Sequence, residues 1–283
     1  MSSYRFCRTD DIGLLVDALN RCWSPHFPDE PATTPASFKR SIRDLQVWCS
    51  SCMVAFDGAD PIGVLIGAKR PSGTLIHRIA IHPDHLRQGH GRHLLASISS
   101  KLAILGPPRL VTEVPEALTA ASALFTACGY LEEASLTDYV LQTDPAGRVA
   151  NQGPWFVIPV TADDLAANGL LGDAHPPVCW ERSVETLTAR KDEISGLAVA
   201  SDEQLEAYLL HAKDGEVLSL RSLVDDGGAR LRHLLSLVGG TQETSVLRMA
   251  KVHPGEIQGE LLGSVGFQPA GTYRVYAGRA RSA

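Results

Sequence analysis

Short apolar runs, separated by polar or glycine-containing turns, follow one another through the first half of the chain. Residues 52–56 and 62–67 have the composition of two strands, and the Asp57-Gly58 turn between them predicts a hairpin. Further apolar runs predict strands over residues 75–81 and 110–114. The pattern therefore indicates a β-rich region that helices must cover.

Helical spacing appears between these runs. Arg92, Leu94, Leu95 and Ile98 start one amphipathic helix, and residues 117–128 form a second that stops at a glycine. Residues 4–8 are expected to form a first strand, with a helix starting after it. Residues 130–141 are expected to form two short closing strands. Strands interspersed with helices predict the α/β class.

The segment between the third predicted strand and the following helix is the most informative of the chain. The apolar run ends at His82-Pro83, and the loop 86–91 then carries two glycines, Gly89 and Gly91, ahead of the helix. Glycines let backbone approach a ligand closely, and the free amides of a helix N-terminus attract an anion. Arginines at 87 and 92 add positive charge. The segment therefore predicts a phosphate cradle.

Two common phosphate motifs are excluded. The dinucleotide fingerprint needs a third glycine where Leu94 stands, and no GxxxxGK[ST] loop is present. What remains is a strand, then V/I-x-P-x-x-x-R-x-G-x-G, then an amphipathic helix. This pattern resembles the acyl-CoA-binding motif of the GNAT acetyltransferase superfamily, and the predicted element order over residues 1–142 fits that resemblance.

The resemblance implies a cosubstrate, acetyl-CoA, and a site for it. In this family the strand before the cradle splays away from its neighbour, and the backbone in the gap holds the pantetheine arm. By resemblance these backbone groups are those of Ile79, Ala80 and Ile81, one of whose amides would polarise the thioester carbonyl. The pyrophosphate would lie on the amides of Arg87, Gln88, Gly89, His90, Gly91 and Arg92.

The chain departs from the family pattern at two positions. Leu86 replaces the arginine or glutamine that often opens the family's loop signature. This difference is tolerable because backbone amides can still bind the pyrophosphate. Phe125 stands at the cofactor-site position, four residues before Gly129, where many members place a tyrosine as acid for the leaving thiolate. Phenylalanine cannot donate a proton. The acid for the leaving thiolate could instead be Cys128, Tyr130 or water, or the reaction could proceed without a dedicated acid; the sequence leaves these alternatives open.

Two residues are candidates for the base that deprotonates the acceptor amine. His77 lies on the strand that lines the acceptor side, and Glu113 lies at the end of the next strand. For each residue an ordinary structural role is an equally good interpretation, as a half-buried strand histidine and as a solvated strand-end glutamate. The acceptor pocket is expected at the loop 21–34, where Trp23, His26 and Phe27 are either substrate contacts or loop anchors. Asp29 and Glu30 give only a slight indication of a cationic acceptor.

An internal repeat extends the interpretation to the whole chain. Residues 89–92 are matched by 227–230, and Gly129-Tyr130 by Gly266-Phe267, in one order with a slowly shrinking offset. We therefore expect two tandem GNAT-like domains, each a twisted and splayed mixed sheet flanked by helices.

The expected boundaries are 1–145 for an N-terminal acyl-CoA-binding domain and 150–283 for a C-terminal one, joined near residues 143–147. In the second cradle Asp225 and Asp226 replace the basic loop. Carboxylates repel a pyrophosphate, so this cradle is expected to be degenerate.

Composition narrows the range of partners. The chain has 283 residues, 44% of them hydrophobic, and a net charge of −6 with no basic block, so nucleic acid is not an expected partner. It has no apolar run long enough for a membrane span and no signal-like N-terminus, so we expect a cytoplasmic protein away from membranes. The oligomeric state, a homodimer included, stays open.

The six cysteines and ten histidines give no metal-ligand pattern. Cys49 and Cys52 have C-x-x-C spacing, but no second ligand pair follows, and the pair leads into a strand rather than a helix. Structural thiols are the favoured reading, and no metal is expected.

The leading hypothesis is an acyl-CoA-dependent N-acyltransferase that moves acetyl from acetyl-CoA to a primary amine of a small molecule or peptide. The alternatives are a non-catalytic acyl-CoA sensor and a structural tandem scaffold.

Overall fold

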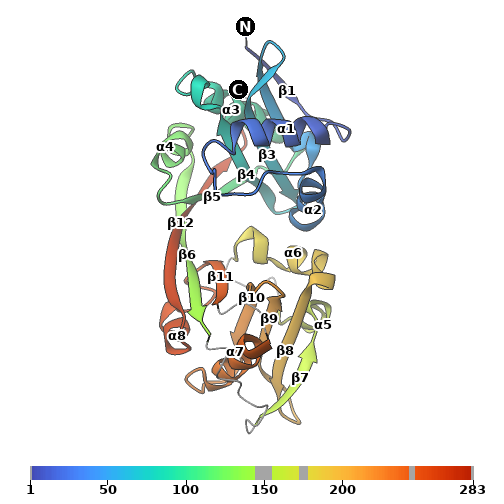
Figure 1. Ribbon diagram of the computed structural model, residues 1–283, viewed down its shortest axis with the longest axis vertical. Coiled ribbons are helices and arrows are strands. Elements are labelled where there is room, and N and C mark those ends of the chain that lie inside the picture. The colour runs from blue at the N-terminus through green and yellow to red at the C-terminus, as the bar shows by residue number, and fades with distance from the viewer. Residues whose placement is uncertain (1, 144–154, 172–177, 242–245, 282–283) are drawn as a thin grey trace. The chain divides into compact units, whose positions relative to one another are not determined.

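The computed structural model describes residues 2–143, 155–171, 178–241 and 246–281. The chain forms two compact units, one of Met1–Ala134 with Arg274–Ala283 and the other of Ser135–Tyr273. These bounds differ from the expected 1–145 and 150–283 because two long strands, β6 (Leu131–Gln142) and β12 (Gln268–Arg279), each run from one unit into the other (Figure 1). Of the expected linker, residues 144–147 lie outside the described residues.

The first unit is built on a mixed sheet. Its antiparallel part consists of β1 (Ser2–Phe6), β2 (Met53–Asp57), β3 (Asp60–Arg70) and β4 (Gly73–Ile81). Strand β5 (Arg109–Pro115) pairs with β4 in parallel, and β12 and then β6 follow it in the sheet. The predicted hairpin and the two predicted strands after it are confirmed.

Helices cover both faces of this sheet. They are α1 (Ile12–Cys22), α2 (Pro35–Leu45), α3 (His90–Leu105) and α4 (Thr119–Ala127), with 3₁₀ turns η1 (Cys49–Ser51) and η2 (Pro83–His85). Leu94, Leu95 and Ile98 of α3 pack with Phe125 of α4 on one face. On α2, the Thr34 and Ser37 side chains form a reciprocal capping box, which fixes where that helix begins.

The expectation of two short closing strands over 130–141 is wrong. The segment forms the single 12-residue strand β6, and its sheet neighbour is β12, from near the other end of the chain. Tyr276 of β12 is 5% exposed and belongs to the core that contains Phe125. The amide of Ala280 donates to the carbonyl of Pro108 at 2.6 Å. The first unit therefore completes its core with a segment that is distant in sequence.

The second unit repeats the element order of the first. It consists of β7 (Phe156–Val160), α5 (Ala162–Ala167), η3 (Trp180–Arg182), α6 (Val184–Ala189), η4 (Lys191–Glu193), β8 (Ile194–Ala200), β9 (Leu205–Ala212), β10 (Val217–Ser222), α7 (Ala229–Thr241), β11 (Val246–Val252) and α8 (Gly259–Ser264). Strands β10, β9, β8 and β7 form an antiparallel sheet, and β11 pairs with β6. The tandem repeat expected from the sequence is thus present in the fold.

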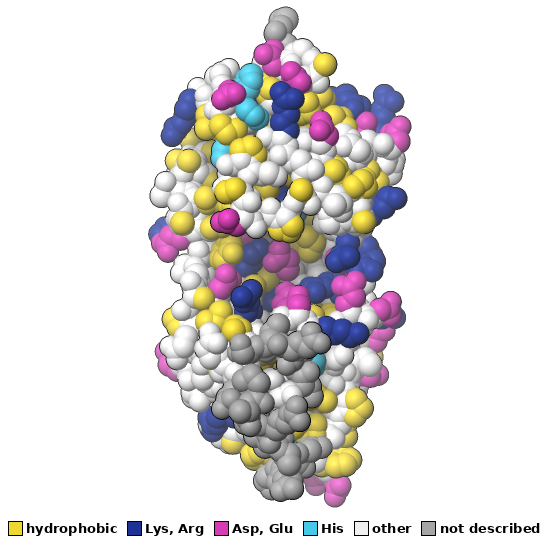
Figure 2. All heavy atoms as spheres, in the orientation of Figure 1, with side chains coloured by type: hydrophobic (Ala, Val, Ile, Leu, Met, Phe, Trp, Pro, Cys, Tyr) yellow, Lys and Arg dark blue, Asp and Glu magenta, His cyan; other side chains and the backbone are white. Residues whose placement is uncertain are grey.

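Two further features concern the surface charge and the apolar character of the helices. Acidic and basic side chains are interspersed over the face shown in Figure 2, and no basic stripe crosses that face. Within the described ranges, none of the helices combines the length and apolar character that a membrane crossing requires.

Candidate active site

Strands β4 and β5 separate soon after they meet. They pair only at Thr74–Leu110 and Leu75–Val111. At the next position the Thr112 hydroxyl donates to the Ile76 carbonyl at 3.1 Å. Beyond that point no further pair joins the two described strands, so their carboxyl-terminal ends flank an opening in the sheet.

A β-bulge lies beside this opening. Ile66 of β3 pairs with Arg78, but Gly67 pairs with Ile76, which leaves His77 as an extra residue on β4. Neighbouring strand residues normally point to opposite faces, and a bulge changes that direction. As a result, both His77 and Arg78 line one pocket.

The open edge of β4 presents backbone groups of Ile79 and Ile81. The His82 amide donates to the Ile62 carbonyl at 2.9 Å, and bonding direction alternates along an antiparallel ladder. Ile79 and Ile81 therefore turn their amides and carbonyls away from β3, whereas Ala80 bonds to β3. The Ile81 carbonyl accepts a hydrogen bond at 2.8 Å from Nε2 of His26.

The predicted cradle follows β4 directly. Arg87 (φ 61°) and Gly89 (φ 88°) both adopt left-handed backbone, and Gly89 is the N-cap of α3. The nearest backbone bonds are those from the amides of Leu86 and His93. In the described part of the chain, the six consecutive amides of residues 87–92 find no protein acceptor. Such a run at a helix start is an anion-binding arrangement.

The side chains around the cradle leave its amides open. A Cβ at Gly89 would meet nothing within 4 Å, but its φ is one that glycine adopts at little cost. A Cβ at Gly91 would lie 3.1 Å from Leu124. The His90 ring turns inward, is 5% exposed, and shares a hydrogen bond of 2.7 Å between its Nδ1 and the Tyr4 hydroxyl. Arg87 and Arg92 are exposed.

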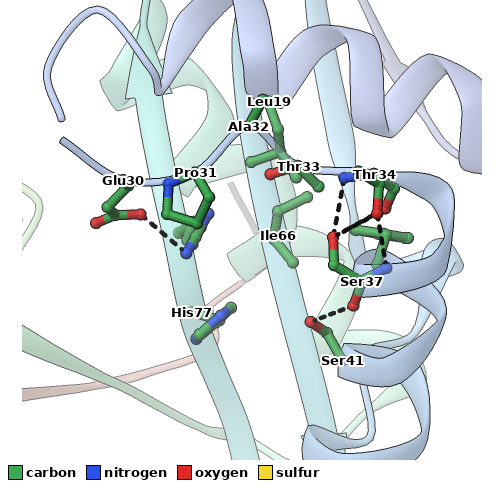
Figure 3. Close-up of a pocket in the computed structure, with 12 residues that line it drawn as sticks. Leu19, Glu30, Pro31, Ala32, Thr33, Thr34, Ser37, Ser41, Ile66 and His77 are labelled. Atoms are coloured by element: carbon green, nitrogen blue, oxygen red, sulfur yellow. Dashed lines mark hydrogen bonds and ion pairs between the residues drawn. The ribbon is translucent and has the colours of Figure 1, made fainter. Parts of the chain in front are cut away.

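A pocket of about 340 Å³ lies on one face of the sheet beside the bulge (Figure 3). Residues 30–34 and the first turns of α2 form its rim, and Leu19, Phe38 and Ile66 contribute apolar lining. His77 points toward this space from β4. Glu113 is half-buried and, by strand alternation, lies on the face opposite to Thr112 and Val114.

Contacts within the first unit anchor the loop over this pocket. Trp23 Nε1 donates to Glu30 at 3.0 Å, and Arg78 bonds the same carboxylate oxygen at 3.2 Å. The Arg78 guanidinium also lies 4.7 Å from the Trp23 ring centre, and Phe27 stacks on that ring at 4.3 Å. Trp23 and Phe27, left open as contacts or anchors, serve as anchors here.

The comparisons with known proteins agree with this geometry. The model of the Acetyltransferase (GNAT) family matches residues 14–130, which include the opening, the cradle and the pocket. Residues 14–130 are a GNAT domain.

Solved structures resemble the whole chain. A tandem GNAT protein from the clavulanic acid biosynthesis pathway, solved without AcCoA, aligns over 100% of both chains with 16% identity and a TM-score of 0.67. A GCN5-related N-acetyltransferase from Sphaerobacter thermophilus covers 99% of this chain and 96% of its own, with 15% identity and a TM-score of 0.68. These likenesses show a tandem GNAT fold. No curated protein matches the sequence.

Phe125 lies in the core of the GNAT domain. It is 1% exposed, with the rings of Tyr130 and Tyr276 at 5.3 and 6.3 Å. The Tyr130 hydroxyl is buried and has no hydrogen-bond partner among the described residues. Burial raises the pKa of Tyr130, and it also raises the pKa of Cys128, against the opposing effect of Arg92. Neither group is therefore primed to release a proton.

In the second unit, the side chain of Asp226 occupies the loop that corresponds to the cradle. Asp226 accepts the Gly228 amide on one oxygen and the Arg230 amide on the other, both at 2.9 Å, and it also pairs with the Arg230 guanidinium. A protein carboxylate thus takes the position that an anionic ligand would need. The GNAT domain has no such internal anion in its described cradle.

Removing this carboxylate should destabilise the start of α7. Burial opposes ionisation of Asp226, but bonds from Arg230 and Gly228 outweigh it and hold the pKa below its usual value. This stabilisation is present above the ordinary aspartate pKa and is lost as pH falls through the folded value. Asp226→Ala should cost about 1 kcal/mol at pH 7, seen as roughly fivefold faster hydrogen exchange in α7.

The control for this variant is its exposed neighbour, Asp225→Ala, which should leave exchange in α7 unchanged. The effect of Asp226→Ala should fade only as pH falls through the folded pKa of Asp226, which lies below the ordinary aspartate value. An effect that is unchanged once this carboxyl group is protonated in the folded protein would show that the carboxylate charge is not responsible.

The cysteine pair of the first unit is buried and consists of free thiols. Within the described residues, no group of three or more metal-ligating side chains could hold an ion. Cys7, Cys49 and Cys52 are all buried, and the Cys7 amide donates to the Cys52 carbonyl at 2.9 Å. Burial raises the pKa of all three thiols, that of Cys7 to about 12. Thiolate, the reactive form, is therefore scarce.

We expect the folded protein to show at most one reactive thiol with Ellman's reagent at pH 8. That thiol is Cys128, the half-exposed one, and Cys128→Ser should remove the signal. At pH 8 a thiol of pKa near 12 is ionised in only about one molecule in ten thousand. All six cysteines should react after unfolding in urea. Rapid labelling of two or more thiols in the folded protein would contradict burial.

Proposed function

We propose that the first unit is an acyl-CoA-dependent N-acyltransferase that transfers acetyl from acetyl-CoA to a primary amine. The observation that carries this proposal is the run of six unfilled amides at the start of α3, adjoining the opening between β4 and β5. An anion site and a gap in a sheet, placed end to end, suit a long cosubstrate with a diphosphate in its middle.

The chain's own groups fit that cosubstrate. The amides of Arg87, Gln88, Gly89, His90, Gly91 and Arg92 would hold the pyrophosphate. The outward-facing backbone of Ile79 and Ile81 would hold the pantetheine arm, and Ala80 would keep the strand attached to β3. Phe125 would support this face from the core. Acetyl-CoA supplies the activated acetyl group.

Acceptor chemistry belongs to the other face of the sheet. An amine in the pocket would approach the thioester through the opening, and His77 or Glu113, which share that face, would take its proton directly or through water. The amide of Ile79 or Ile81 would polarise the thioester carbonyl. A carbon–nitrogen bond forms, the carbon–sulfur bond breaks, and CoA leaves as thiolate. The raised pKa of Tyr130 and of Cys128 favours departure without a dedicated acid.

The second unit would contribute no acyl-CoA site, because Asp226 fills its cradle. Isothermal titration of the full chain with acetyl-CoA should therefore give one site per chain. The absence of any binding would overturn the proposal.

A non-catalytic acyl-CoA sensor is the second candidate, and Phe125 at the family's tyrosine position favours it. Release of CoA thiol in the presence of an amine separates the two. Turnover with any amine rejects the sensor, whereas acetyl-CoA binding without turnover across a broad amine panel supports it.

A further inference from the structure

We infer that the acceptor is a small zwitterion, namely an α-amino acid with an apolar side chain, bound in the pocket beside the bulge at His77. The inference rests on the proposed function, because it names the amine that the transferase would acetylate. It follows from the hydrogen bonds that the polar groups of the pocket already make and from the signs of the charges in its lining.

The hydroxyl groups of the rim have little left to donate. Ser37 Oγ accepts from the Thr34 amide at 2.9 Å and donates to the Thr34 carbonyl at 3.0 Å (Figure 3). Ser41 Oγ donates to the Ser37 carbonyl at 3.3 Å. The backbone of Thr33 is bonded in both directions to the Asn20 side chain. A sugar, whose recognition needs many hydrogen bonds, would find few partners here.

Besides His77, the lining carries one acidic and one basic side chain, Glu30 and Arg78. Their side chains are 42% and 27% exposed, and an ion pair that is this accessible is worth at most about 1 kcal/mol. A carboxylate can therefore share the guanidinium, which has five donors, while an ammonium can share the Glu30 carboxylate. A ligand with one charge of each sign matches this pair.

The charge balance disfavours the other amine classes. A polyamine would bring several positive charges to a pocket whose single carboxylate already faces Arg78. A phosphorylated amine would bring two negative charges next to Glu30. Leu19, Phe38 and Ile66 offer apolar surface to a side chain, and a volume of about 340 Å³ lies at the low end for ligand pockets. The apolar surface and small volume suit leucine or methionine better than an aminoglycoside.

The test is CoA thiol release by the full chain at saturating acetyl-CoA, with leucine, methionine, spermidine and glucosamine as acceptors. We expect leucine or methionine to give the highest kcat/KM. Arg78→Gln should raise KM for leucine about tenfold or more and leave KM for acetyl-CoA within about twofold. Arg78→Lys keeps the charge and should lie between the two. Arg40→Gln, an exposed residue on α2, is the matched control.

The outcomes distinguish this inference from the proposed function. Preference for spermidine or glucosamine, or an unchanged leucine KM in Arg78→Gln, overturns the inference and leaves the transferase standing. If acetyl-CoA binds but none of the four amines is acetylated, the inference is overturned, and if no amine of the broad panel is acetylated either, the transferase activity is rejected as well. Titration of each variant with acetyl-CoA shows whether it is still folded. An Arg78→Gln variant that no longer binds acetyl-CoA is therefore not counted as support for the inference.

Discussion

Acetyl-CoA binding should be lost when Gly89 and Gly91 are both replaced by glutamate. Gly89 has φ 88°, so a side chain there strains the loop, and a Cβ at Gly91 would lie 3.1 Å from Leu124. The two added carboxylates would also repel the pyrophosphate that these amides are proposed to bind. We expect affinity to fall by at least about a hundredfold, or about 2.7 kcal/mol, as measured by titration.

The matched control is the pair Gly13→Glu and Gly58→Glu. Gly58 has φ 58° in a hairpin turn, Gly13 lies in the first turn of α1, and a Cβ at either would meet nothing within 4 Å. These changes add the same charge and comparable backbone strain away from the cradle, so binding should survive. Equal affinities in the two double variants would refute the cradle.

Truncating Tyr276 to alanine should destabilise the first unit by about 3–5 kcal/mol, the usual cost of removing a large core aromatic. Tyr276 is 5% exposed and packs with Phe125 in the core shared by α3 and α4. Because α3 begins at the cradle, acetyl-CoA binding should fail together with the fold. Hydrogen exchange of α3 and α4 amides, together with acetyl-CoA titration, measures both effects.

Leu131→Ala is the control for this variant. Leu131 is 73% exposed at the start of β6, so its loss should change stability by less than about 0.5 kcal/mol. If Tyr276→Ala were as stable as Leu131→Ala, the strand over residues 268–279 would not contribute to the core of the first unit.

Local patterns were enough to predict the elements that precede and form the cradle. The apolar run ending at His82 and the two glycines after it need only their neighbours to be understood, and the structure has β4, η2 and α3 there. The tandem repeat could also be predicted from the sequence, because the corresponding turns occur in the same order in both halves of the chain.

Features set by distant partners were not predictable. Nothing in residues 130–141 indicates that their sheet neighbour lies at 268–279, so two strands were expected where one exists. The bulge at His77 depends on the register with β3, which a single inserted residue changes. The Trp23–Arg78 contact joins residues that are far apart in sequence, so the anchoring of the loop was not visible either.

The exchange of strands between units also has a consequence for biosynthesis. About 140 residues separate Ala134 from Arg274, the two ends that must meet in the first unit. At translation rates of 5–20 residues per second, the ribosome needs roughly 7 to 28 s to bridge that distance. During this interval the nascent first unit has unpaired strand edges and an incomplete apolar core, which are features that chaperones bind. Folding of this half is therefore completed late, after most of the other half has been made.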